Sequence, residues 1–133
     1  MEIFDVICIG AALIDLIAQV ERHPSDDDEV FVSNLTLLSG GAAANTACAC
    51  GKLGLSTAFI GKLGQNDIFT NKIMSDFNDV SVETKFIKYS NIYPTGSAYV
   101  ALDKKGDRRI YAHSGAANYL SNNDLLEEEI AAT

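Results

Sequence analysis

Short runs of apolar residues mark the first strands of this chain. Residues 4–9 favour β-structure and are followed by Gly10, which predicts a buried strand. Residues 14–20 alternate between two faces, one wholly apolar and one carrying Asp15 and Gln19, as a half-exposed strand does. Residues 30–38 predict one or two further strands.

Two later segments carry helical patterns. Small residues run through 42–53, and Gly54 follows them in the position of a C-terminal stop. Residues 57–60 predict a second core strand, ended by Gly61. Asn66 or Asp67 then caps a helix in which apolar residues recur every fourth position through Phe77.

The last third of the chain departs from this alternation. Residues 82–89 resemble another strand and complete a βαβα pattern, which predicts a parallel sheet covered by helices. Residues 97–102 and 108–113 alternate on either side of a polar turn, which predicts a hairpin. A capping-box-like spacing predicts an acidic helix over residues 121–130.

Composition and charge narrow the classes of function. The chain has 133 residues, 47% of them hydrophobic, which is enough for one domain with a core. A net charge of −8 disfavours a nucleic-acid partner, and no stretch is apolar for long enough to cross a membrane. Cys8, Cys48 and Cys50 form neither an even disulfide set nor a CxxC pair. Since no signal peptide precedes them, we expect a cytoplasmic protein.

The stretch from Ser39 to Asn45 is the strongest candidate for chemistry. Gly40 and Gly41 stand ahead of a helix, where the backbone is open to a ligand and the first N–H groups lack partners. Asn45 offers an amide donor and an acceptor, which suits a polyhydroxylated ligand. The same residues also fit a tight strand–helix junction in which Asn45 only fixes the loop.

Spacing connects this stretch to a known family. The chain resembles the ribokinase-like (PfkB) carbohydrate kinases, whose first signature has the order and intervals of Gly40, Gly41, Asn45, Ala47, Gly54 and Gly64. The similarity continues outside that signature, at Gly10 with Asp15, at Thr95-Gly96 before an alternating strand, and at Gly115-Ala116-Ala117-Asn118 before the acidic helix. It therefore covers nearly the whole chain.

Two positions depart from the family pattern. Ala42 stands where ribokinases proper commonly carry lysine, which weakens an assignment to ribose in particular. Thr70 stands where the family often has glycine, and we expect a structural cost only.

The resemblance implies an α/β fold, a parallel-sheet sandwich of the ribokinase type with a small β-sheet lid. This chain would form its N-terminal part. We expect residues 1–14, 39–90 and 114–133 to belong to the α/β core, and residues 15–38 and 91–113 to form the lid.

The resemblance also implies a site for a sugar or nucleoside substrate. The Asp15 carboxylate would accept hydrogen bonds from adjacent hydroxyls, because its two oxygens can hold two donors. Gly40 and Gly41 would present backbone groups, and Asn45 would bind another hydroxyl. Candidates for lid contacts that close over the apolar face of the sugar are Tyr99 and Tyr111.

The sequence contains no residue to which the family's phosphoryl-transfer role can be assigned. No GAGD motif, in which the family's base and anion hole lie, occurs in residues 1–133, and no Walker sequence is present. His23 and His113 are too isolated for a triad or a zinc site. We therefore expect no metal site and no ATP turnover by this chain alone, with ATP and Mg²⁺ serving a full-length parent.

Two other classes of protein remain open. A non-catalytic binding or assembly module would keep the fold, and its lid strands would pair in a homo-oligomer. The weaker alternative is a Rossmann-type nucleotide-binding domain, since no GxGxxG follows the first strand.

Overall fold

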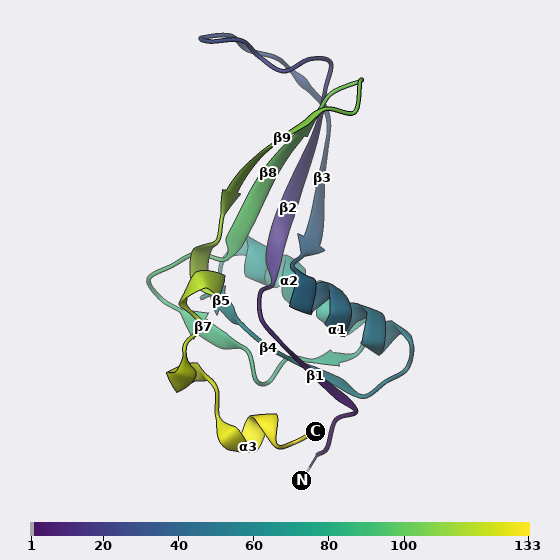
Figure 1. The fold of residues 1–133 in the computed structure, drawn as a ribbon, viewed down its shortest axis with the longest axis vertical. Helices are drawn as coiled ribbons and strands as arrows, with labels where there is room; N and C mark the ends of the chain where they lie inside the picture. The colour runs from purple at the N-terminus through teal and green to yellow at the C-terminus, as the bar shows by residue number, and fades with distance from the viewer. Residues whose placement is uncertain (1) are drawn as a thin grey trace.

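A three-stranded parallel sheet forms the base of the structure (Figure 1). The computed structural model describes residues 2–133. Strand β4 (Thr57–Ile60) lies between β1 (Val6–Ile9) and β6 (Val82–Glu83), and both pairings are parallel. All four β4 residues are buried, because this central strand is covered on both faces. The predicted parallel sheet is confirmed.

Two helices cover one face of this sheet. Helix α1 (Ala42–Lys52) buries Ala44 and Ala47, and helix α2 (Ile68–Asp79) buries Thr70, Ile73 and Phe77. Their apolar side chains join Phe59 of β4 in the main core. The small residues of α1 let the helix approach the sheet closely. Its predicted stop is observed, with Gly54 at a φ of 90° just beyond the last turn.

The predicted strand over residues 82–89 is interrupted. Only Val82–Glu83 belongs to the main sheet, and the chain then makes a turn in which the Ile87 N–H donates to the Thr84 carbonyl at 3.1 Å. After the turn, β7 (Lys88–Ser90) pairs with β5 (Lys62–Gly64) in a separate two-stranded sheet. One apolar run therefore serves two sheets.

The predicted acidic helix over residues 121–130 is observed only in its last part, Glu127–Ile130. Ser121 and Asp124 do form a capping box, but it opens only a 3₁₀ turn, η2 (Asn122–Asp124). Leu125 then adopts an extended conformation with a φ of −99° and a ψ of 104°, which ends the turn before α3 (Glu127–Ile130) begins. Another 3₁₀ turn, η1 (Gly115–Tyr119), precedes this region.

A second sheet of four strands projects away from the base (Figure 1). Its order is β3 (Val32–Gly40), β2 (Leu13–Val20), β8 (Gly96–Leu102) and β9 (Arg108–His113). The β8–β9 hairpin is antiparallel, as expected, and residues 30–38 contribute one strand rather than two. The parallel pairing of β2 with β8 joins segments about 80 residues apart and unites the β2–β3 and β8–β9 hairpins in one open sheet. The division into core (1–14, 39–90, 114–133) and lid (15–38, 91–113) stays a prediction.

A buried polar network fixes the base of β8. The Thr95 hydroxyl accepts a hydrogen bond from the Gly64 N–H at 2.8 Å and lies 2.7 Å from the Thr70 hydroxyl. Thr70 in turn donates to the Gly64 carbonyl at 2.6 Å. The Thr70 hydroxyl therefore makes two hydrogen bonds inside the core. These bonds offset the structural cost expected from threonine at a position where glycine is common.

Asp67 belongs to the same network. Its carboxylate accepts the Thr70 N–H, which caps α2, and the Thr95 N–H at 2.9 Å. Burial opposes ionisation, but hydrogen bonds from Thr95 and Thr70 outweigh it and lower the pKa of Asp67. Because the folded state lowers this pKa, the ionised carboxylate stabilises the fold above its ordinary pKa, and that contribution is lost as the pH falls.

We predict that Asp67→Ala lowers the free energy of unfolding by about 1–2 kcal/mol at neutral pH, since it removes a cap and a second backbone acceptor. The difference in free energy of unfolding between the variant and the native chain should become smaller as the pH falls below about 4, because the native carboxylate is then protonated. Urea denaturation followed by circular dichroism measures both effects. Asp26→Ala, in an exposed loop, is the control. A difference that stays constant across pH would contradict the assignment.

Candidate functional site

Asp15 lies against the backbone of Gly40 where the lid meets the core. In the strand register, Leu13 pairs with Gly40 and Asp15 pairs with Leu38, so these residues share one face of the lid sheet. A Cβ atom built on Gly40 would stand 2.7 Å from Oδ2 of Asp15. The carboxylate occupies the space that a side chain at position 40 would need, so the structure brings two predicted site residues together.

Gly41 makes a second close approach. Its φ is 100°, and a Cβ atom would stand 2.4 Å from the carbonyl oxygen of Ala11. Gly10 approaches Ala43 in the same way, since an added Cβ would lie 2.9 Å from the Ala43 Cβ. These contacts place the segment joining β1 to β2 directly on the first turn of α1. The glycine pair thus forms a tight junction beside Asp15, and its role in binding a substrate stays a prediction.

The N-terminus of α1 points its first turn at this junction. Gly41 is the cap residue, and its carbonyl accepts the Asn45 N–H at 2.8 Å. The Ala44 N–H donates to the Ala11 carbonyl at 3.3 Å. An eleven-residue helix carries a partial positive charge at this end, which suits the electron-rich oxygens of a ligand.

The side chain of Asn45 is exposed and borders a different hollow. It lines a groove of about 430 Å³ between α1 and α2, together with Ser39 and Asp76. The described contacts therefore do not join Asn45 to Asp15. Its role in binding a ligand hydroxyl stays a prediction.

A small hollow of about 150 Å³ lies beside the Asp15 face of the lid. It is lined by Ala11 from the β1–β2 connection, by Leu13 at the start of β2, and by Ser114, Ala117 and Asn118 from the segment after β9. The stretch Gly115 to Asn118 thus meets the root of β2. Sequence reasoning did not single out Leu13 or Asn118 as site residues. Leu13 lies two residues before Asp15, so its side chain points to the same face of the strand; this alternation could have identified it from the sequence.

The register places the two predicted lid tyrosines on the face away from Asp15, and their contact with a ligand stays a prediction. Tyr99 pairs with Leu16 on one side and with Tyr111 on the other, so all three lie on the face of the sheet opposite to Asp15. Both tyrosines are exposed on that outer face. The Asp15 face carries the apolar residues Ile17, Ala98, Val100 and Ile110, and the polar residues Gln19, Asn34 and Thr36 lie further along it.

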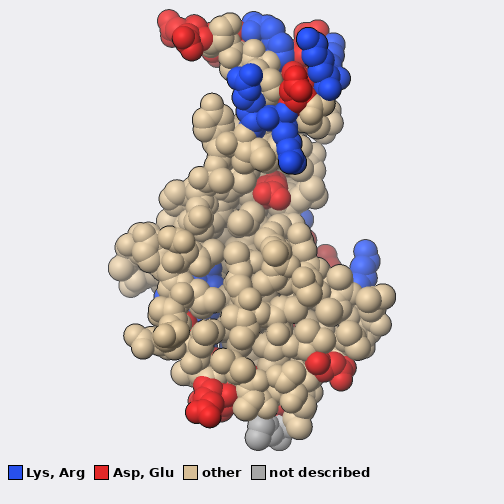
Figure 2. Space-filling view, viewed as in Figure 1, with Lys and Arg blue, Asp and Glu red and all other residues tan. Residues whose placement is uncertain are grey.

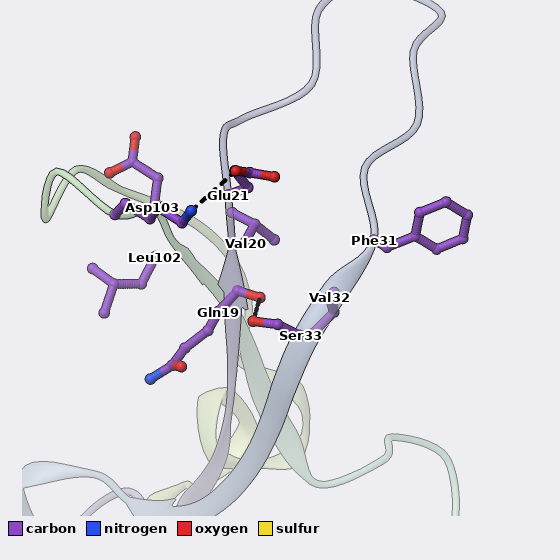
Figure 3. Close-up of a pocket in the computed structure, with 9 residues that line it drawn as sticks. Gln19, Val20, Glu21, Phe31, Val32, Ser33, Leu102 and Asp103 are labelled. Carbon is purple, nitrogen blue, oxygen red and sulfur yellow. Dashed lines mark hydrogen bonds and ion pairs between the residues drawn. The ribbon is translucent and has the colours of Figure 1, made fainter.

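The tip of the lid carries a third hollow, far along the strands from Asp15. It measures about 510 Å³, and Figure 3 shows Phe31 turned outward beside it while Glu21 pairs with Lys104. In the view of Figure 2, charged side chains gather at this tip, which also holds the Arg22–Asp28 pair. Exposed pairs of this kind add little stability. We assign this hollow no part in the candidate site.

The remaining titratable groups do not suggest another reactive centre. Burial, with smaller effects of Cys50 and Cys48, raises the pKa of the Cys8 thiol, which keeps it protonated. Nε2 of His23 lies 3.0 Å from the Asp107 carbonyl and ties two loops at the lid tip. Over residues 2–133, no group of three or more His, Cys, Asp or Glu side chains is placed to hold a metal ion. Nor does any helix of this range have the length and apolarity needed to cross a membrane.

The comparisons with known proteins identify the family. The family model described as "pfkB family carbohydrate kinase" matches residues 4–132, and the chain belongs to that family. A ribokinase from Staphylococcus aureus (strain COL) is 26% identical over 127 residues, which is 95% of this chain and 41% of that protein.

Solved structures agree with this assignment. The Arabidopsis thaliana ribokinase, described as complexed with ribose and ATP, gives a TM-score of 0.77 at 27% identity, covering 86% of this chain and 37% of that one. A nucleoside kinase from Methanocaldococcus jannaschii gives the same TM-score at 26% identity, covering 86% and 38%. The ribokinase-type fold predicted from the sequence is confirmed. The chain spans about two fifths of the length of these relatives.

We predict that Gly41→Ala lowers the free energy of unfolding by more than about 2 kcal/mol, because it combines a positive φ with a clash against backbone. Gly54→Ala is the matched control: its φ of 90° is also positive, but no atom lies within 4 Å of the added Cβ. That variant should cost only about 1 kcal/mol. Equal losses in urea denaturation would show that the contact with Ala11 does not matter.

Proposed function

We propose that the protein containing this chain transfers a phosphoryl group from ATP to a hydroxyl of a sugar or nucleoside, and that residues 2–133 provide part of the substrate site and its lid. The observation that carries this proposal is the Asp15 carboxylate, which lies against Gly40 on the same face of the lid sheet as Leu13 and Ala98. Family membership supports the reaction class.

The arrangement suits a polyol. An ionised carboxylate accepts two hydrogen bonds and can hold two adjacent hydroxyls. The apolar residues that share its face of the sheet, including Leu13, Ala98 and Val100, would offer a surface for the carbon face of a sugar and exclude water. Such exclusion would limit transfer of the phosphoryl group to water.

The class of substrate rests on two kinds of relative. Ribokinases and a nucleoside kinase match at similar identity, and the Arabidopsis structure is described with ribose and ATP. Ala42 replaces the lysine common in ribokinases. We therefore propose a furanose-containing substrate without choosing between a free sugar and a nucleoside.

We assign the binding of ATP and Mg²⁺ to the whole protein rather than to this portion. Phosphoryl transfer needs a nucleotide site, a metal and a base for the attacking hydroxyl. Residues 2–133 contain no group of three or more metal-ligating side chains, so we propose no Mg²⁺ ligand among them. We propose that the chain by itself binds sugar but does not turn over ATP.

One observation favours the second candidate function, an assembly module. The outer face of the lid is apolar and exposed: Leu35, Leu37 and Tyr99 are 50%, 38% and 39% exposed. Exposed apolar faces of this kind mark interaction surfaces. We propose that two copies associate through their lids, which is compatible with substrate binding on the opposite face.

For the substrate site, we predict that Asp15→Asn weakens sugar binding at least about tenfold, because an amide offers one acceptor instead of two charged ones. Isothermal titration of the chain with D-ribose and with adenosine measures the effect. Asp26→Asn makes the same change in an exposed loop and should have none. Native-like affinity in the Asp15 variant would refute this role.

For the assembly, we predict that Leu35→Lys shifts the chain toward a monomer in sedimentation equilibrium, because it places a charge on the outer face. Thr36→Lys is the matched control, since Thr36 is its exposed neighbour on the opposite face of β3. A native chain that is monomeric at all concentrations would contradict association through the lid.

A further inference from the structure

The base of β3 is tied to α2 by a side-chain hydrogen bond. The Ser39 hydroxyl donates to Oδ2 of Asp76 at 2.5 Å. The other carboxylate oxygen of Asp76 accepts a hydrogen bond from Nζ of Lys72 at 3.0 Å. Ser39 immediately precedes Gly40, so the bond acts on the strand end that carries the glycine pair.

The same helix also holds the neighbouring strand. Ile14 pairs with Ser39 across the sheet and is fully buried in the core that contains Ile73 and Phe77 of α2. Asp76 lies three residues after Ile73 and next to Phe77, at the edge of that packed face. Helix α2 therefore contacts β2 through apolar packing and β3 through the Ser39–Asp76 bond.

Helix α2 holds both strands beside the point where the Asp15 carboxylate lies against Gly40. Ile14 precedes Asp15, and Ser39 precedes Gly40, so α2 holds the residue next to each of the two. The Cβ position of Gly40 stands only 2.7 Å from the Asp15 carboxylate. A shift of β3 against β2 would move the backbone on which that carboxylate rests, and small displacements of a positioning group are costly for a site.

We infer that Asp76 is a positioning residue for the proposed sugar site, acting through Ser39 to hold the Gly40 backbone against the Asp15 carboxylate. The inference rests on the proposed function for its ligand. Its structural step, the ordering of residues 38–41, does not depend on any ligand and is measured separately.

Asp79 is the natural control for Asp76. It lies one turn further along α2, is exposed and lines the same groove, yet the described contacts give its side chain no bond to β3. Lys72→Ala is a second control, because it removes the exposed ion pair while leaving the Ser39 bond in place. The conservative variant Ser39→Thr keeps the hydroxyl in a residue that favours strands.

The experiment combines amide hydrogen exchange by NMR with titration of D-ribose and adenosine into the full chain. Ser39→Ala and Asp76→Ala should each speed exchange at residues 38–41 and weaken sugar binding by about fivefold to tenfold, because each removes the Ser39–Asp76 hydrogen bond. The double variant should be no worse than either single one, since both single variants remove the same bond. Ser39→Thr, Asp79→Ala and Lys72→Ala should behave like the native chain.

Each outcome decides the inference. Unchanged exchange and affinity in Ser39→Ala and Asp76→Ala, strictly additive losses, or an equal change in Asp79→Ala would overturn it. If Asp76→Ala fails to fold, the contrast between Ser39→Ala and Ser39→Thr carries the test. If the native chain binds neither D-ribose nor adenosine, the proposed function fails, and local exchange at residues 38–41 alone then supports or overturns the positioning role.

Discussion

Close backbone approach at three glycines is the constraint on which the rest of this structure depends. Gly10 meets Ala43, Gly41 meets the Ala11 carbonyl, and Gly40 meets the Asp15 carboxylate. A side chain at position 41 would clash with the Ala11 backbone, and one at position 40 would displace the Asp15 carboxylate. The lid, the core and the candidate site therefore meet at one junction, and the acidic group gains its place because no Cβ atom occupies it.

Helix α2 holds the ends of two lid strands near that junction. Its N-terminal end fixes the base of β8 through Asp67, Thr70 and Thr95, and its middle fixes the base of β3 through Asp76. The two attachments differ in kind, since the first is buried and the second is only partly so.

The sequence predicted those parts of the fold that have clear periodicity. Residues 57–60 and both long helices lie where apolar spacing placed them, and the hairpin turn was visible in its polar residues. The two- and three-residue strands were not predictable, because such short pairings have no period of their own. The helix predicted over residues 121–130 was too long, because the capping box at Ser121 opens only a single 3₁₀ turn.

The site was predictable in part for the same reason. Asp15 and the glycine pair follow from motif spacing, whereas the orientation of Tyr99 depends on which residue of β8 pairs with Asp15. That pairing, with Ala98, joins segments far apart in the sequence, and a shift of one residue would have turned Tyr99 inward. The most direct test of the central claim is an NMR titration of the chain with D-ribose and adenosine, following backbone amides. The account predicts shifts at Asp15, Gly40, Gly41 and the adjoining residues of β8, and it is contradicted if saturating ligand shifts no amide or only those of the outer lid face.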